Sequence, residues 1–216
     1  MKRAPGIVFA AWVLLTVLGG CATSRSEIAL VSPAATPPVP TAGKPAVIRS
    51  IKDERVFEQA PRDPGRPSLG FEGAAQASAD TKARAIGRKR NTYGQALGDV
   101  LLQPGQTIER VVRENLTAAL HQSGYRVVTE REAGSALVLD VRIRKFWSWI
   151  QPGFWAITLH TAIATDLQMS GSPAPAVVDV KSSEGLQVAS DGNWIEAVGK
   201  ALAAYRAEAA KVLSAR

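Results

Sequence analysis

The side chains that most often carry catalysis or metal binding are few in this chain. Two histidines, His121 and His160, and one cysteine occur among its 216 residues. A histidine pair could ligate a metal or move a proton if the fold brought the two rings together. The sequence has neither a glycine-rich phosphate loop ending in Lys-Ser or Lys-Thr nor a G-x-S-x-G nucleophile motif. We therefore expect no catalytic site, no metal and no cofactor.

The single cysteine, Cys21, follows an apolar run at 7–18 that two basic residues precede. A run of this length suits the core of an export signal and is shorter than the roughly 20 residues that a spanning helix needs. The tripeptide Leu-Gly-Gly at 18–20 resembles the lipobox of bacterial lipoproteins, in which the cysteine receives diacylglycerol and becomes the new N-terminus. We expect removal of residues 1–20 and lipidation of Cys21. An ordinary secretory signal with an unmodified cysteine is the alternative.

The expected lipid anchor determines where the protein would reside. Each buried methylene contributes roughly 0.8 kcal/mol, so two or three acyl chains would hold the protein on a membrane. Ala22 stands where lipoproteins kept in the inner membrane often carry Asp, so the resemblance implies the periplasmic face of the outer membrane. Residues 21–45 are rich in Pro and lack an apolar face, which predicts an extended tether of up to roughly 70 Å. Residues 46–216 would form the periplasmic domain.

Positive charge concentrates in one stretch, residues 82–90. After removal of the signal the chain has 24 Lys and Arg against 19 Asp and Glu, a formal charge of +5. A basic run attracts polyanions, and outside the cytoplasm we expect anionic lipid, lipopolysaccharide phosphates or an acidic protein face instead of nucleic acid. A solvated loop without a partner is the alternative. The candidate anion contacts are Lys82, Arg84, Arg88, Lys89 and Arg90.

Aromatic side chains concentrate in residues 146–155, which hold three of the five tryptophans. The Pro-Gly pair at 152–153 predicts a hairpin turn within this run. Aromatic rings exposed at a hairpin tip favour contact with a partner pocket or with the membrane interface. The alternative is a tip that folds back over the sheet and completes the core. The candidate contacts are Trp147, Trp149, Trp155, Phe146 and Phe154.

Apolar periodicity predicts the elements that position these runs. Helical spacing covers 107–124 and 193–212, and Asn193 with Glu196 forms a capping-box pattern. Strands are predicted at 46–51, 125–128, 137–144, 155–169 and 176–182. Residues 53–104 are rich in Pro, Gly and charge, and form either a functional loop or short elements that the pattern does not show. We expect an α+β domain with a mostly antiparallel sheet of about five strands and two amphipathic helices on one face.

The order of these elements resembles the YajG-type bacterial lipoproteins and, more loosely, the auxiliary lipoproteins of ABC-type envelope transporters. Short motifs carry the resemblance: Cys21, the Asp53-Glu54-Arg55 element, the Ile86-Gly87 pair, and a helix at 111–125 that ends in a Gly-aromatic step. The resemblance covers residues 46–215. It implies a small periplasmic α+β domain with an accessory role and without catalysis.

Three functions follow from these patterns. The first is a non-catalytic, lipid-anchored module that binds an envelope protein and assists assembly or transport. The second is a carrier of an apolar or lipid ligand, which would need a dry cavity between sheet and helices instead of a filled core. The third is a cell-wall-acting enzyme, against which the missing nucleophile, acid and base argue.

Overall fold

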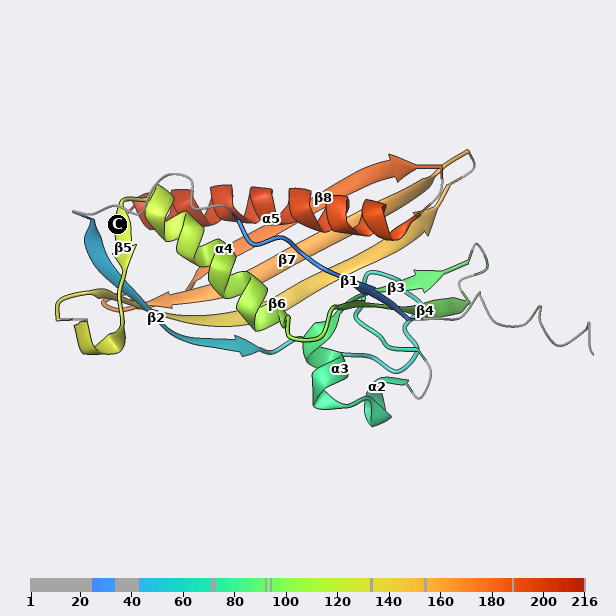
Figure 1. Cartoon of the computed structure of the whole chain (residues 1–216), viewed down its shortest axis with the longest axis horizontal. Coiled ribbons are helices and arrows are strands. Elements are labelled where there is room, and N and C mark those ends of the chain that lie inside the picture. The colour runs from blue at the N-terminus through green and yellow to red at the C-terminus, as the bar shows by residue number, and fades with distance from the viewer. Residues whose placement is uncertain are drawn as a thin grey trace, which may run out of the picture.

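The computed structural model describes residues 25–33, 43–70, 73–91, 93, 95–132, 134–153, 155–187 and 189–215. Cys21 and the expected export signal lie outside the described residues, and so does Phe154. The described strands form one eight-stranded sheet (Figure 1). They are β1 (Ser26–Ile28), β2 (Lys44–Asp53), β3 (Ala85–Arg90), β4 (Ala96–Leu102), β5 (Tyr125–Val127), β6 (Leu137–Pro152), β7 (Ile157–Met169) and β8 (Ala176–Leu186).

The described helices are α2 (Gly73–Gln76), α3 (Ala79–Arg84), α4 (Ile108–Gln122) and α5 (Asp191–Ser214), with a 3-10 turn at Glu130–Glu132. Two of them, α4 and α5, begin and end close to where local sequence predicts, whereas α2 and α3 lie in the stretch 53–104, for which no helix was predicted. The hydroxyl of Thr107 caps α4, and Gly124 follows the helix with a φ of +80°. Ser190 caps α5 and Asn193 bonds back to it, so the predicted cap at Asn193 is corrected by three residues. No described helix is long and apolar enough to cross a bilayer.

The sheet is mixed, which corrects the expectation of a mostly antiparallel sheet of about five strands. Its order is β1-β4-β3-β6-β2-β5, with β7 paired to β6 and β8 paired to β7. Among the described strands four pairs are parallel, β1–β4, β2–β5, β2–β6 and β3–β6. Three pairs are antiparallel, β3–β4, β6–β7 and β7–β8, which confirms the predicted β6–β7 hairpin. The unpredicted strands β1, β3 and β4 lie in the stretches that are rich in Pro, Gly and charge.

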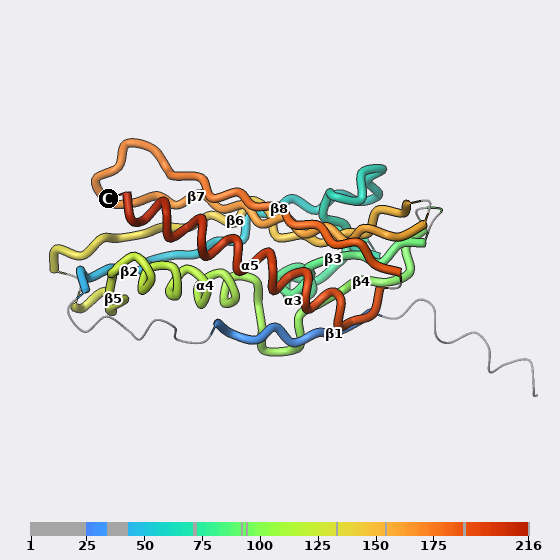
Figure 2. Tube along the Cα trace, turned by 90° about the horizontal axis from the view of Figure 1, so that it is seen from above, coloured from blue at the N-terminus to red at the C-terminus, as the bar shows by residue number. Residues whose placement is uncertain are grey.

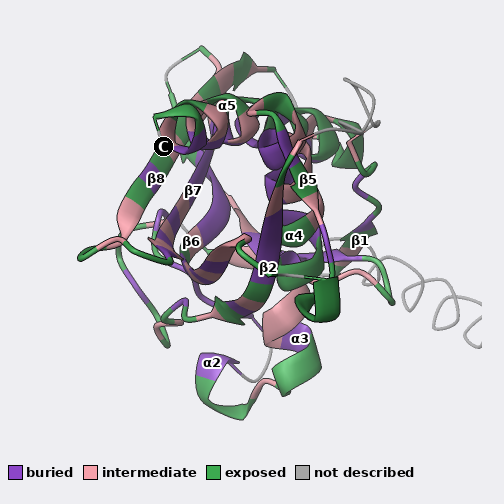
Figure 3. Ribbon diagram, turned by 90° about the vertical axis from the view of Figure 1, so that its left-hand side faces the viewer, coloured by how far each residue is buried: buried purple, intermediate pink, exposed green. Residues whose placement is uncertain are grey.

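The main core lies between the sheet and helices α4 and α5. The sheet curls around the two helices, and buried residues line its inner face and the facing sides of both helices (Figure 3). Helix α4 contributes Leu116 and Leu120, and α5 contributes Trp194 and Leu202. Side chains from both layers therefore fill the space that an internal ligand carrier would keep open.

A second, smaller core lies on the other face of the sheet. Part of the stretch 53–104 covers this face, and the view from above places it across the sheet from α4 (Figure 2). Leu69 and Leu101 pack there against Trp147 and Trp149. Of the two predictions for this stretch, a functional loop or short elements without a visible pattern, the second is the one observed, because short elements in it pack against the sheet.

Strand β1 corrects the predicted extent of the tether. It lies within 21–45, yet Ile28 and Leu30 are buried in the main core. The side-chain amide of Gln106 accepts from the backbone N–H of Leu30 at 3.1 Å and donates to its carbonyl at 2.7 Å. These two bonds replace those that a neighbouring strand would make. Residues 25–30 therefore belong to the fold.

Candidate functional site

Two hairpins turn at the same end of the sheet, which we call the hairpin end. Strands β3 and β6 run parallel with Arg88 opposite Trp149, so both strands approach their turns side by side. Helix α5 also begins at this end, while the C-terminus lies at the opposite end (Figure 1). The hairpin end thus brings together three distant parts of the chain, the β3–β4 hairpin, the β6–β7 hairpin and the start of α5.

A groove of about 390 Å³ opens here between the β3–β4 hairpin, the ends of β6 to β8 and the start of α5. We call it the hairpin groove. Its volume lies within the range of ligand pockets, roughly 300–1,000 Å³. The groove has an apolar floor and a cationic rim. The floor is formed by Leu97, Ile150, Ile157 and Trp194, and the rim by Lys89 and Arg90.

The rim of the hairpin groove carries positive charge. The ammonium of Lys89 bonds the hydroxyl of Ser26 and forms an ion pair of 3.3 Å with the Asp191 carboxylate at the start of α5. Arg90 donates to the hydroxyl of Ser68 at 3.3 Å. The groove thus has two cationic side chains next to the carboxylate of Asp191, and cationic side chains favour an anionic group on a ligand.

Trp194 gives the floor a polar group. Its side chain is fully buried, and its indole N–H has no acceptor within the described part of the chain. The indole packs on Gly87, where an added Cβ would lie only 2.6 Å from Trp194 Cζ3. A buried donor without an acceptor costs roughly 1–3 kcal/mol.

The structure separates the predicted aromatic contacts. Phe146 and Trp147 are fully buried, Trp149 is 7 % exposed and Trp155 is 84 % exposed. The first three follow the alternative in which the tip packs on the sheet, so their proposed exposure is wrong. Phe146 packs in the main core, whereas the segment that covers the second core buries Trp147 and Trp149. The carbonyl of Pro64 in that segment accepts from Trp147 Nε1 at 3.1 Å.

The first two basic candidates, Lys82 and Arg84, lie in α3 and are half-buried. Arg84 forms ion pairs of 2.9 Å with both Glu27 and Asp80, and these hydrogen-bonded carboxylates raise its pKa. The carbonyl of Lys82 accepts from Arg55 at 2.7 Å. Arg84 therefore has its anionic partners inside the fold.

The other three, Arg88, Lys89 and Arg90, lie on β3 instead of a solvated loop. Arg88 donates to Ser68 at 3.3 Å, and burial followed by the repulsion of Arg90 lowers its pKa. Lys89 and Arg90 lie on the hairpin groove, so the structure brings two of the five predicted anion contacts to the candidate site.

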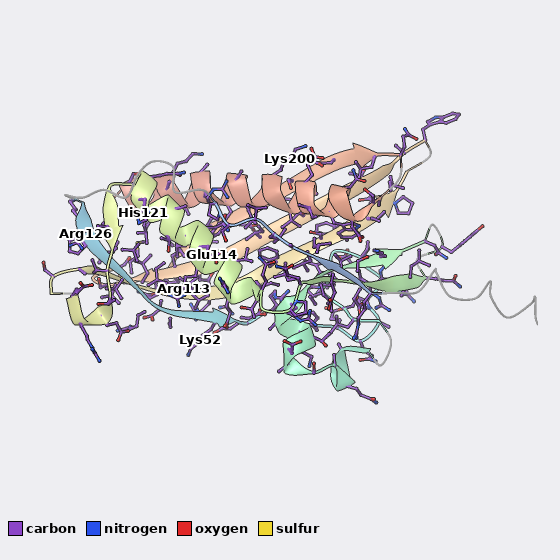
Figure 4. The ribbon with its side chains drawn as sticks, in the orientation of Figure 1. Lys52, Arg113, Glu114, His121, Arg126 and Lys200 are labelled. Carbon is purple, nitrogen blue, oxygen red and sulfur yellow. The ribbon has the colours of Figure 1, made fainter. Side chains whose placement is uncertain are left out.

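The two histidines lie on different elements. His121 lies in the last turn of α4 (Figure 4), whereas His160 lies on β7 and stacks on Trp149 at 5.1 Å between ring centroids. Burial, and next the charge of Lys181, lowers the pKa of His160. Within the described ranges, no three His, Cys, Asp or Glu side chains form a group that could hold a metal.

A second depression, of about 470 Å³, lies along β2 and β6 and includes Lys52 (Figure 4). Its lining is charged, and one of its carboxylates, Asp140, is paired with Arg49. The hydrogen bond from Arg49 lowers the pKa of Asp140. This depression has no apolar floor comparable to that of the hairpin groove, which is why we take the groove as the candidate site.

Sequence reasoning missed most residues of the hairpin groove. Leu97 and Ile157 lie at the ends of strands, where local patterns are weakest, and Trp194 was expected only as part of the apolar face of a helix. Tyr93, which is 89 % exposed in the β3–β4 turn, was also missed. Gly87 would indicate the contact with Trp194, because a glycine within a strand marks a close approach by another group, but the strand that contains it was not predicted.

No family model matches the chain, and no curated protein sequence matches it. Among similar solved structures, a Xanthomonas campestris protein described with the family DUF330 aligns over 90 % of this chain and 91 % of its own, with 14 % identity and a TM-score of 0.41. Another, an uncharacterized protein, aligns over 89 % and 97 % respectively, with 13 % identity and a TM-score of 0.37. These likenesses identify neither a shared fold nor a shared role, and the resemblance to YajG-type lipoproteins stays a prediction.

Proposed function

We propose that this chain is a lipid-anchored, non-catalytic binding module of the bacterial cell envelope. Acylated Cys21 holds it on the periplasmic face of the outer membrane, where it binds another envelope component and assists assembly or transport. One observation carries this proposal: the hairpin groove, apolar below and cationic at its rim, lies beside the strand that leads back to Cys21. Lys89 on the rim bonds Ser26, only five positions after Cys21.

The chemistry of the groove defines the component that would fit. An apolar segment would displace water from Leu97, Ile150 and Ile157, and an anionic group would face Lys89 and Arg90. The partner is therefore amphipathic and acidic. We propose a segment of an envelope protein that combines apolar with Asp or Glu side chains.

Carriage of an apolar or lipid ligand is the second candidate function. The apolar floor of the groove favours it, since an acyl chain with an anionic headgroup has the same chemistry as the proposed segment. The filled main core weighs against it, because a carrier needs an enclosed cavity to take the whole apolar part of its cargo out of water. An open groove suits a docked segment better.

Photocrosslinking in intact cells tests both candidates. A photoreactive residue replaces Leu97 or Ile157 in the groove, and the matched control replaces Val177, which is 61 % exposed on β8 at the other end of the sheet. We expect the same identified envelope protein at both groove positions and not at Val177. Lipid adducts confined to the groove would favour carriage instead.

Capture at the groove positions that does not exceed capture at Val177 would contradict both candidates. A Cys21→Ser variant tests the anchor separately, because loss of the acyl chains should release the protein from the membrane fraction. If that variant stays in the membrane fraction, the lipid anchor is wrong whatever the crosslinks show.

A further inference from the structure

The link between Cys21 and the folded domain is short. Arg25 donates to the buried carboxylate of Asp99 at 3.3 Å, and the same carboxylate accepts from the backbone N–H of Gly70 at 2.7 Å. Arg25 is thus tied to the sheet by an ion pair, just before β1. Four residues span at most about 14 Å, so Cys21 lies within about 14 Å of Arg25.

Arg25 is held near the hairpin end. Its partner Asp99 lies opposite Arg88 on the β3–β4 hairpin, whose turn includes Tyr93. Tyr93 follows Arg88 by five positions, so it lies at most about 17 Å from Arg88. The turn therefore projects beyond Arg25 about as far as the link to Cys21 can reach. A bilayer that holds the acyl chains of Cys21 lies within reach of both hairpin turns.

The two turns carry the side chains that suit such a surface. Trp155 in the β6–β7 turn is 84 % exposed and Tyr93 in the β3–β4 turn is 89 % exposed. They are the two aromatic residues among the strongly exposed large apolar side chains of the described chain. Trp and Tyr are the residues that concentrate at membrane–water interfaces, because their rings are apolar with one polar edge.

Charge at the same end complements an anionic surface. Lys89 and Arg90 lie behind the two turns on the groove rim, and cationic side chains near a membrane are attracted to anionic headgroups. At the opposite end of the sheet the exposed apolar residue on β8 is Val177, which lacks a polar edge. The hairpin end therefore carries the aromatic and cationic side chains that suit a membrane surface, whereas Val177 at the opposite end is aliphatic and uncharged.

We infer that the hairpin end rests on the bilayer that holds Cys21, with Trp155 and Tyr93 in the headgroup layer and the cationic rim of the hairpin groove close to that layer. This inference rests on the proposed lipidation of Cys21 and adds a fixed orientation to it. The hairpin groove then lies next to the membrane surface, so a membrane-bound segment reaches it without crossing the periplasm. A domain that stands off on a long tether would have no such restriction.

The test uses the full-length acylated lipoprotein in liposomes of phosphatidylethanolamine and phosphatidylglycerol. Because acylation blocks the thiol of Cys21, a cysteine introduced as W155C, Y93C or V177C is the one that an environment-sensitive dye labels. All three positions are strongly exposed, so these changes leave the core intact. We expect a blue-shifted dye and several-fold stronger quenching by spin-labelled lipid at 155 and 93 than at 177.

Labels at 155 and 93 that remain as exposed to water as the label at 177 would overturn the inference and leave the lipid anchor standing. The mass of the purified chain tests the anchor itself. A chain without acyl groups, with a reactive thiol at Cys21 and all three labels in the aqueous fraction, would overturn both the anchor and the orientation.

Discussion

Replacing Arg55 by methionine should lower the free energy of unfolding by about 3–5 kcal/mol. Arg55 is 7 % exposed, and its guanidinium bonds both carboxylate oxygens of Asp53 at 2.8 and 2.7 Å. Its remaining hydrogen bonds go to three backbone carbonyls, those of Ala85 at 2.6 Å, Phe146 at 3.1 Å and Lys82 at 2.7 Å. One side chain thus joins the end of β2 to α3, β3 and β6.

The magnitude follows from what the substitution leaves behind. Methionine is long and flexible enough to retain apolar contacts beside Phe57, so the loss is mainly that of charge and hydrogen bonds. The Asp53 side chain is 17 % exposed and loses its cation, while three carbonyls lose a charged donor. Removing one partner of a buried ion pair costs about 3–5 kcal/mol, and the backbone N–H that still reaches Asp53 at 3.2 Å favours the lower half.

Urea unfolding followed by circular dichroism measures the change, with Arg66→Met as the matched control. Arg66 pairs with Glu58 at 2.7 Å, but the two side chains are 61 % and 38 % exposed, so we expect a loss of about 0–1 kcal/mol. Added salt should weaken the control pair and leave the Arg55 contribution nearly unchanged. If Arg55→Met costs no more than Arg66→Met, the reasoning is refuted.

Two further substitutions test the packing beneath the groove and the buried hydroxyl of α5. Gly87→Ala should lower the free energy of unfolding by about 1–3 kcal/mol, because the added Cβ would lie 2.6 Å from Trp194. The control is Gly185→Ala, whose Cβ meets nothing within 4 Å. A thermal scan of both variants should show a lowered Tm for Gly87→Ala and a nearly unchanged Tm for Gly185→Ala. Burial raises the pKa of Tyr205 to about 12. Below about pH 10 the hydroxyl keeps its proton in both the folded and the unfolded chain, so its contribution to the free energy of unfolding is fully present. As the pH rises from 10 toward 12 the unfolded chain loses the proton first, and the free energy of unfolding falls. Tyr205→Phe removes the 3.1 Å bond to Thr165 and should flatten this alkaline fall in urea unfolding; an unchanged slope would contradict the role of this hydroxyl.

The helices and strands that could be predicted from the sequence are those whose stabilising residues lie close together in the chain. Helix α4 carries its cap, its apolar stripe and its terminal glycine within one continuous segment, and all three are observed. Strands β6 and β7 alternate over many residues and pair across a short turn. In each case the residues that stabilise the element are its sequence neighbours, so a reading of the chain alone suffices.

Strands β1, β3 and β4 depend on partners far along the chain. β1 pairs with β4 about 75 positions away, and Gln106 completes the bonding of Leu30. β3 carries a run of cations, a composition that suggests a solvated loop until Ser26, Ser68 and Asp191 are known to lie beside it. Such contacts have no local pattern, which is why the sheet was predicted with too few strands and as mostly antiparallel.

The candidate site shows the same limit. Trp149 and Trp155 lie six positions apart in one aromatic run, yet one is buried and the other exposed. Alternation predicts that successive side chains point to opposite faces, but it cannot show that Phe57, Leu69 and Ala77 pack over the second face. The hairpin tip itself was predictable, whereas the extent of its exposure depended on a segment without a recognisable pattern.

The Asp-x-Arg element links the predictable part of the chain to the part that was not. Asp53 and Arg55 are two positions apart, so their ion pair forms within one short segment. The guanidinium of Arg55 also donates to the carbonyl of Ala85, the first residue of β3. That strand ends at Lys89 and Arg90 on the groove rim. A variant such as Arg55→Met that still folds should therefore exchange amide protons faster along β3 than along α4, whose hydrogen bonds do not depend on Arg55. Equal exchange in both elements would mean that the motif stabilises the fold as a whole without positioning the groove.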